Sequence, residues 1–228
     1  MRAITWMLAA AALTIGATPS LAKAPTTWDG LVHVDSKKVQ AVYLLPNADF
    51  RGYTQVMFDP PQVAFRKNWR LDYNSSEDDP MAYVSSNYVT KAVALAQQNL
   101  AKVFPESFGR AGITVASAPG PHVLRLAVYI VDLTVAAPDV AQDMSSTFSV
   151  DAGTATFAIE ARDSQSGQLL GRAVDAQAAG DNGTYRRTYS SNVSDFEALF
   201  KTWAQISAKG FDELRTLSPI NTDGMQRK

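Results

Sequence analysis

The chain contains no cysteine among its 228 residues. This absence excludes a disulfide framework, a thiolate nucleophile and a metal site built on thiolates. It also excludes a lipid anchor attached to a cysteine behind a signal peptide. An exported form of this protein must therefore reach its stability through packing and hydrogen bonds alone.

Histidine is nearly as scarce, since the chain contains only His33 and His122. Neither has a second His, Asp or Glu at the spacing that places two metal ligands on one helix face. We therefore expect no metal ion and no cofactor. A Ser/His/Asp triad would need one of these two histidines, and no nucleophile-elbow, phosphate-loop or dinucleotide-binding motif is present. The sequence thus offers no catalytic motif, and we expect a protein that is not an enzyme, with no catalytic residue assigned.

An excess of charge of one sign is also missing. The 21 Lys and Arg residues nearly balance the 22 Asp and Glu residues, and the formal net charge is −1. A nucleic-acid-binding surface needs a basic excess gathered on one face. We therefore expect no nucleic-acid partner. The 46% share of hydrophobic residues is that of an ordinary globular protein.

A long apolar run occurs only at the start of the chain, from Ile4 to Ala17. It follows the positive Arg2, and small residues stand at Ser20 and Ala22, as in a signal-peptidase site. The run is shorter than the ~20 residues that a helix needs to cross a bilayer. We predict that residues 1–22 are a signal peptide. The mature protein would be periplasmic or secreted, with no transmembrane segment. A buried N-terminal helix and a retained membrane anchor are the alternatives.

The clearest structural signal is a hairpin from Thr154 to Ala178. Apolar and polar residues alternate from Phe157 to Arg162, which is the period of a strand with one buried face. The stretch from Asp163 to Gly167 is typical of a turn. The Asp side chain can accept from backbone N–H groups, and the Gly can adopt a positive φ. The segment from Leu169 to Ala178 is the return strand.

Other elements follow from periodicity and from helix signals. We predict a helix over Asn87–Phe104, ended by Pro105, because apolar residues recur there at helical spacing. A second helix is predicted to begin at Ser194, where Glu197 completes a capping box. The polar stretch Ala136–Ala152 is predicted to be a mobile connection. The predicted strands outside the hairpin are Val39–Leu45, Thr54–Phe58, Ile113–Ala116 and Val123–Leu133.

These elements predict an α+β fold, with an antiparallel or mixed sheet of about five strands and two main helices packed on it. No internal repeat and no break in composition marks a second domain. We therefore predict a single domain over residues 23–217, followed by a flexible C-terminal tail over residues 218–228.

The most distinctive polar region runs from Ala48 to Tyr73, where basic side chains are interleaved with aromatic ones. Arginine and aromatic residues together can form a surface that stacks on, or pairs with, a partner. The alternative is that the rings lie in the core while the arginine stems cover it. The candidate binding residues of this region are Arg51, Tyr53, Arg66, Trp69 and Arg70.

Several stretches together resemble DUF3313, a family of bacterial exported proteins of unknown function. They are Trp28–Leu31, the block from Ala41 to Phe65 (AVYLLPNADFRGYTQVMFDPPQVAF), the hairpin from Ile159 to Asp175, and the helix around Trp203-Ala204. The resemblance implies a location in the cell envelope and supplies no activity. Many members are lipoproteins, and this chain departs from them by lacking the cysteine that would carry the lipid.

The sequence therefore favours a non-enzymatic periplasmic or envelope protein that binds an envelope partner, most simply another protein. One alternative is an exported, hydrolase-like enzyme whose site has no motif. Its acid and base could be Glu160, Asp163 or Asp175, although surface charge and turn capping also explain these carboxylates. A second alternative is a binder of small molecules or glycans that uses Trp28 and Trp69.

Overall fold

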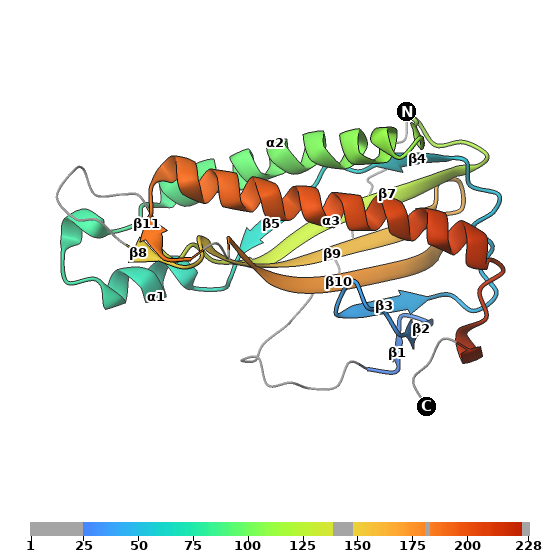
Figure 1. Cartoon of the computed structure of the whole chain (residues 1–228), viewed down its shortest axis with the longest axis horizontal. Coiled ribbons are helices and arrows are strands. Elements are labelled where there is room, and N and C mark those ends of the chain that lie inside the picture. Colours follow the sequence, from blue (N-terminus) through green and yellow to red (C-terminus); the bar gives the residue numbers. More distant parts are fainter. Residues whose placement is uncertain (1–24, 139–147, 181–182, 225–228) are drawn as a thin grey trace, which may run out of the picture.

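The computed structural model describes residues 25–138, 148–180 and 183–224. The predicted signal peptide and residues 139–147 of the predicted mobile connection lie outside these ranges. A long sheet forms one layer, and the helices α2 and α3 lie side by side across one of its faces (Figure 1). The helix α1 projects at one end of the molecule. This arrangement is an α+β fold with a mixed sheet, as the sequence predicts.

The main sheet has nine strands in the described part of the chain, in the order β1-β2-β3-β10-β9-β7-β4-β6, with β5 also paired to β7. Strands β4 and β5 run parallel to β7, and β4 also runs parallel to β6, whereas all other pairs are antiparallel. The sheet is wider than predicted because short edge strands extend it. The strands are β1 Thr27–Trp28, β2 Leu31–Val34, β3 Ala41–Leu44, β4 Gln55–Phe58, β5 Gln62–Phe65, β6 Thr114–Val115, β7 Val123–Leu133, β9 Gly153–Asp163 and β10 Leu169–Ala179. A separate pair joins β8 Phe148–Ser149 to β11 Tyr185–Arg186.

The first long helix, α2, spans Ser86–Arg110 and continues through Pro105. The prediction that Pro105 ends this helix is therefore wrong. Proline removes one backbone N–H donor. The turn beyond it nevertheless buries Phe108, which packs edge-on against Phe58 at 5.2 Å between ring centroids. Packing on this second half of α2 outweighs the lost hydrogen bond.

The last helix, α3, spans Tyr189–Leu217 and begins five residues before the predicted start. Its capping box is formed by Thr188 and Ser191, whose side chains each bond the other's backbone N–H. Ser194 and Glu197 therefore lie inside the helix, and their predicted role as its capping box is wrong. The remaining helices are α1 Trp69–Ser76, the 3-10 turn η1 Pro80–Ala82 and the 3-10 turn η2 Thr222–Gly224.

The central hairpin, formed by β9 and β10, is confirmed. Its turn is held by Asp163, whose Oδ1 accepts from the backbone N of Gln165 at 3.1 Å and of Ser166 at 2.7 Å. These bonds lower the pKa of the Asp163 carboxyl. Gly167 closes the turn with a φ of 74°. A residue with a Cβ is strained in that left-handed conformation, which explains glycine at this position.

The core lies between the sheet and the two long helices. Trp203 of α3 is fully buried, and its ring stacks on Phe157 of β9 at 5.2 Å and on Phe200 at 6.2 Å between centroids. Its indole Nε1 donates to Asp175 Oδ2 of β10 at 2.8 Å. Asp175 is itself buried and also accepts from the backbone N of Gln40 at 3.1 Å. One side chain thus ties α3, the central hairpin and the strand β3 region together.

The predicted tail begins at residue 218, but residues 218–222 pack against the domain. Ile220 is 1% exposed. Its backbone carbonyl accepts from Asn47 N, and its own N donates to the carbonyl of Ala48, both at 2.9 Å. Phe50 N donates to Ser218 Oγ at 2.9 Å. These bonds anchor the segment after α3 to the loop before β4.

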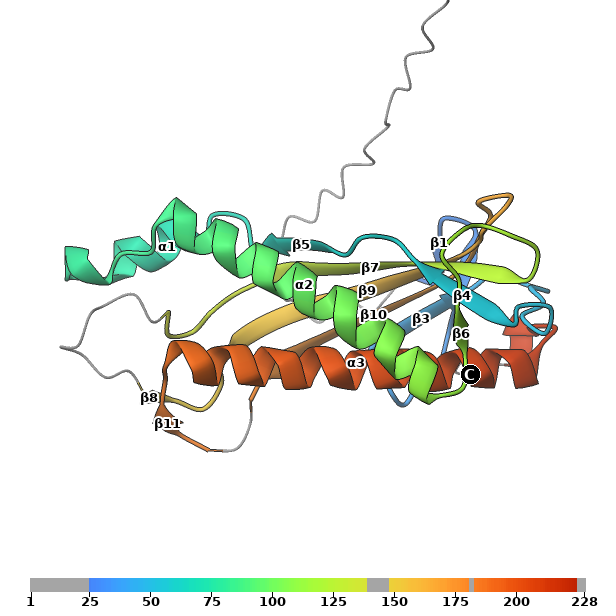
Figure 2. The ribbon, with the colours of Figure 1, turned by 90° about the horizontal axis from the view of Figure 1, so that it is seen from above.

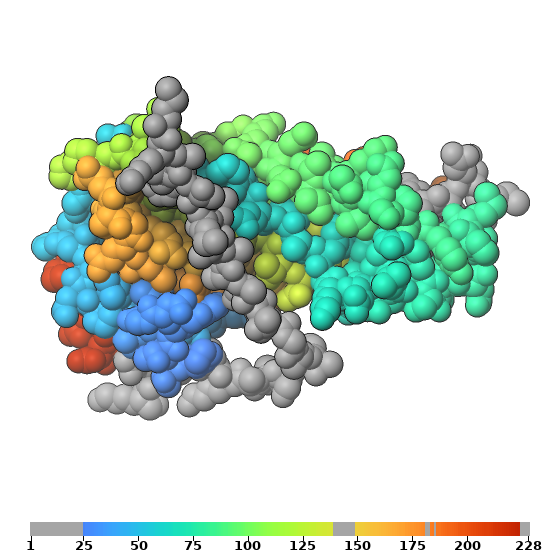
Figure 3. All heavy atoms as spheres, turned by 180° about the vertical axis from the view of Figure 1, so that it is seen from behind, coloured from blue at the N-terminus to red at the C-terminus, as the bar shows by residue number. Residues whose placement is uncertain are grey.

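The face of the sheet away from the helices is seen from behind in Figure 3, where the hairpin lies between the N-terminal strands and β4–β5. A charged cluster stands on this face. Arg172 of β10 is paired with Glu160 of β9 and with Asp29, and its guanidinium lies 3.9 Å from the centre of the Trp28 ring. Burial alone would raise the pKa of Glu160, but Arg172 and Arg162 together lower it. This cluster fastens the N-terminal strands to the hairpin.

Candidate functional site

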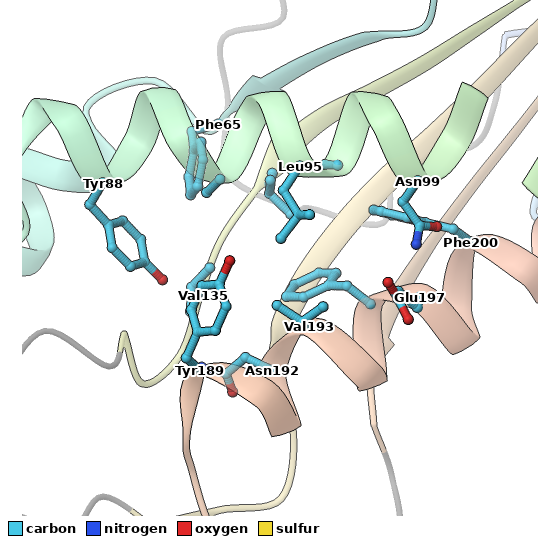
Figure 4. A pocket seen from close by; sticks show the side chains of 14 residues that line it. Phe65, Tyr88, Leu95, Asn99, Val135, Tyr189, Asn192, Val193, Glu197 and Phe200 are labelled. Atoms are coloured by element: carbon cyan, nitrogen blue, oxygen red, sulfur yellow. The ribbon is translucent and has the colours of Figure 1, made fainter. Parts of the chain in front are cut away.

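An apolar groove separates the first half of α2 from the first half of α3 (Figure 4). We call it the helix groove. It contains about 580 Å³ of space, including the part that is open to solvent. Its walls include Tyr88, Ala92 and Leu95 from α2, and Val193 and Phe196 from α3. The sheet closes its back through residues of β5 and β7.

Polar side chains of the helix groove stand near its two ends. Figure 4 shows Tyr88 and Tyr189 near one end, and Asn99 of α2 extending toward Glu197 of α3 near the other. Asn192 is 6% exposed, and its Nδ2 donates to the carbonyl of Ala137 at 2.9 Å. Within the described residues, no protein group donates to the buried Oδ1 atoms of Asn99 and Asn192. Two of the residues that line the groove thus carry an amide oxygen without a protein donor in the described ranges.

A second hollow lies on the other side of α2, against α1, and we call it the basic hollow. It holds about 730 Å³ including open solvent, and Arg66, Trp69 and Arg70 are among its lining residues. Trp69 is 4% exposed and stacks on Phe65 at 4.5 Å between ring centroids. Arg66 Nη2 reaches Asp72 Oδ2 at 3.4 Å, whereas Arg70 has no ion pair within the described residues. Three of the five candidate binding residues thus share one hollow.

The other two candidate residues lie at the opposite end of the molecule, beside the start of β4 (Figure 1). Arg51 is exposed and forms two hydrogen bonds to the carboxylate of Asp49, at 2.9 Å and 2.6 Å. The Tyr53 hydroxyl donates to Asp163 Oδ2 at 3.0 Å. Burial and then this bond raise the pKa of Tyr53 to about 12. The five residues therefore do not form one surface, and their role in binding stays a prediction.

Exposed apolar side chains gather at the end of the molecule that carries α1. Figures 1 and 2 both place α1, η1, β8, β11 and the beginnings of α2 and α3 at this end, which we call the α1 end. Among the described residues, seven large hydrophobic side chains are exposed. Two of them, Val115 and Leu217, lie toward the other end. The five at the α1 end are Leu71, Met81, Tyr83, Val150 and Tyr189.

The carboxylates considered for acid–base chemistry are all engaged in the fold. Glu160 pairs with two arginines, Asp163 holds the hairpin turn, and Asp175 accepts from the core tryptophan. No group of three or more potential metal ligands occurs within the described residues. No helix in the same ranges is long and apolar enough to cross a membrane.

The family model for DUF3313, described as a protein of unknown function, matches residues 23–206. The chain belongs to this family. The match covers the described sheet, the helices α1 and α2 and most of α3. A comparison with curated proteins gives no match.

Three solved structures show a distant likeness. A Xanthomonas campestris protein of the DUF330 family is 13% identical, with a TM-score of 0.41 over 76% of this chain and 91% of its own. A putative neuraminyllactose-binding hemagglutinin homolog from Helicobacter pylori is 7% identical, with a TM-score of 0.39 over 76% and 92%. The PelC dodecamer from Paraburkholderia phytofirmans is 14% identical, with a TM-score of 0.33 over 80% and 94%. At these scores the likenesses carry no argument about the function of this chain.

Proposed function

We propose that this member of DUF3313 is a non-enzymatic envelope protein, periplasmic or secreted, that binds an envelope protein partner through its α1 end. The observation that carries the proposal is the gathering of five of the seven exposed large hydrophobic side chains at that end. Single exposed apolar residues are normal on a protein surface, whereas contiguous apolar patches mark interaction sites, so the end with most of these side chains is the best candidate for an interface.

The composition of the α1 end supports a protein partner. Arg66, Arg70 and the exposed Leu71 line the same basic hollow, and Arg70 and Leu71 are neighbours in α1. Aromatic residues and arginine are enriched at protein interfaces, and they dominate the measured binding energy. Tyr83 and Tyr189 supply aromatic rings that are partly accessible to a partner.

The rival reading, an exported enzyme, has less support. A catalytic acid or base needs an accessible group whose pKa is matched to its task. Glu160 and Asp163 have lowered pKa values and are held by structural partners. The helix groove is lined by apolar side chains, and among its described lining residues Glu197 is the only Asp, Glu, Lys, Arg or His. These features favour binding over chemistry.

The proposal predicts that Leu71→Glu combined with Met81→Glu abolishes partner binding. Both side chains are exposed, at 58% and 75%, so the free energy of unfolding should change by less than about 1 kcal/mol. Chemical crosslinking in intact envelopes, followed by mass spectrometry, should recover the partner at least about tenfold less often than with the wild type.

The matched control is Val115→Glu combined with Leu217→Glu, which places the same charges on exposed apolar residues at the other end. This control should leave recovery of the partner unchanged. If both double variants recover the partner equally poorly, or if both recover it as well as the wild type does, the interaction must use another part of the surface.

A further inference from the structure

We infer that Arg187 is a positioning residue for the proposed interaction. It holds the chain segments that carry Val150 and Tyr189, so that both side chains are already in place when the partner protein docks. This inference rests on the proposed function, because Val150 and Tyr189 belong to the exposed apolar set of the α1 end. We call Arg187 and its ion-pair partner Asp195 the arginine clamp.

The first observation is the burial of a charged pair. Arg187 lies between β11 and Thr188, the capping residue of α3, and its side chain is 0% exposed. Arginine is almost never fully buried unless an opposite charge pairs with it. Here Asp195 of α3 supplies that charge, with its Oδ2 at 2.5 Å from Arg187 Nη1. An apolar pair of similar size would often serve stability as well, so a buried ion pair needs a further reason.

Other donors of Arg187 bind one short segment around the end of β8. Nε donates to Ser149 Oγ at 3.0 Å. Nη2 donates to the backbone carbonyls of Ser149 at 3.2 Å and of Val150 at 2.5 Å. Hydrogen bonds from a charged donor are stronger than those between neutral groups. One guanidinium therefore fastens the segment around Val150 to α3.

The end of β10 is packed against the same pair. Gly180 follows β10 with a φ of 82°, and a Cβ built there would lie 2.4 Å from Asp195 Oδ2. The carboxylate cannot move aside without leaving Arg187, so both the space and the conformation favour glycine at this position. Three segments that are far apart in the sequence thus meet at the arginine clamp: the end of β8, the end of β10 and the beginning of α3.

The arginine clamp fixes the backbone next to two exposed side chains of the α1 end. Val150, whose carbonyl accepts from Arg187, is 48% exposed, and Tyr189, two residues after Arg187, is 57% exposed. Figures 1 and 2 place β8, β11 and the beginning of α3 together at this end. A surface that is held in one conformation loses less conformational freedom when a partner docks. The clamp therefore raises the affinity of the α1 end for its partner.

The test removes the pair with Arg187→Met and Asp195→Asn combined. This change leaves no unpaired charge in the interior, so the exported protein should fold, and the β9–β10 hairpin should keep its protection from hydrogen exchange. The amides around Ser149 and Val150 should exchange at least about tenfold faster, because the bonds from the guanidinium are lost.

The functional readout is photocrosslinking in intact envelopes from p-benzoyl-phenylalanine at the position of Met81. The double variant should lower the yield of the partner adduct at least about tenfold. The matched control is Arg215→Met combined with Asp212→Asn, which makes the same two changes at an exposed ion pair near the end of α3. It should leave the exchange around β8 and the yield of the adduct unchanged.

Arg187→Lys is a second, milder variant that decides the question if the double variant does not fold. It keeps a positive charge opposite Asp195. A single ammonium group cannot reproduce the planar fork that also reaches Ser149 and Val150, so the adduct yield should fall at least about threefold.

The inference is overturned if the exchange around Ser149 is unchanged in a folded double variant, or if the adduct forms from the clamp variants as it does from the wild type. If Leu71→Glu abolishes the adduct while the clamp variants keep it, only this inference fails and the proposed function stands. If the adduct also survives Leu71→Glu, the proposed function fails, and the inference fails with it.

Discussion

Replacing Trp203 with alanine is expected to lower the free energy of unfolding by about 3–5 kcal/mol. The side chain is fully buried, and its ring contacts Phe157 and Phe200. Its removal leaves a cavity between α3 and the central hairpin, and the surrounding rings can only partly close it. The loss also leaves the buried Asp175 without its indole donor, which adds a desolvation cost.

Chemical denaturation monitored by circular dichroism measures this effect. Trp203→Phe separates the two contributions, because it keeps most of the stacking and removes the bond to Asp175. We expect it to cost about 1–3 kcal/mol. Lys201→Ala, on the exposed face of the same helix, should change stability by less than about 0.5 kcal/mol. A Trp203→Ala protein as stable as the wild type would mean that α3 does not close the core as described.

The second large effect is expected at Gly153, the first residue of β9. A Cβ built at this position would lie 1.9 Å from the backbone oxygen of Thr134, and the φ of Gly153 is 146°. Both the clash and the conformation exclude a side chain, and neither can be relieved by moving a flexible group. We expect Gly153→Ala to cost about 4 kcal/mol or more, which is exceptional for the addition of one methyl group.

Two other glycines serve as comparisons for Gly153→Ala. Gly167 has a φ of 74° but open space around it, so Gly167→Ala should cost only the conformational strain of about 1–2 kcal/mol. Gly52 has neither restriction, and Gly52→Ala should stay within about 0.5 kcal/mol. The midpoints of unfolding in denaturant rank the three variants. Equal midpoints for Gly153→Ala and Gly52→Ala would show that β9 does not approach Thr134 so closely.

Strong local patterns explain which elements the sequence predicts. The β9–β10 hairpin alternates in hydrophobicity and carries its own turn chemistry around Asp163, so its pattern and its structure agree. Short edge strands such as β1 and β6 have two residues each, too few to show any period. Helix α1 has no side-chain cap, and only Trp69 among its residues is buried. A helix with one buried residue and no side-chain cap shows neither an apolar stripe nor a capping signal in the sequence.

Local signals also compete with tertiary packing. Pro105 is a strong helix breaker in isolation, yet α2 passes through it because Phe104 and Phe108 on either side are buried. Ser194 and Glu197 have the spacing of a capping box, but Thr188 and Ser191 provide the actual one. Sequence spacing indicates where a helix can start. The packing of the whole face decides where it does.

The candidate site could be predicted only in part from the sequence, because tertiary packing also decides which residues come together. Arg51 and Arg66 lie close in the chain, but β4 and β5 run along β7 between them and carry them to opposite ends of the sheet. The helix groove was missed because Ala92 and Ala96 cannot be told from core positions by periodicity alone. Whether a groove remains between two helices depends on the side chains of both helices and on how closely they pack. The only sign of the groove in the sequence is that small residues occupy the inner face of α2.

The central claim is that the α1 end is the surface that binds an envelope protein. The most direct measurement is photocrosslinking in intact envelopes, with p-benzoyl-phenylalanine placed in turn at the positions of Met81 and Leu217, both of which are exposed. We predict one discrete protein adduct from position 81 and none from position 217. The adduct should disappear when Leu71→Glu is added, because that side chain shares the α1 end. An adduct that forms only at position 217, or one that forms equally at both positions, would contradict the account.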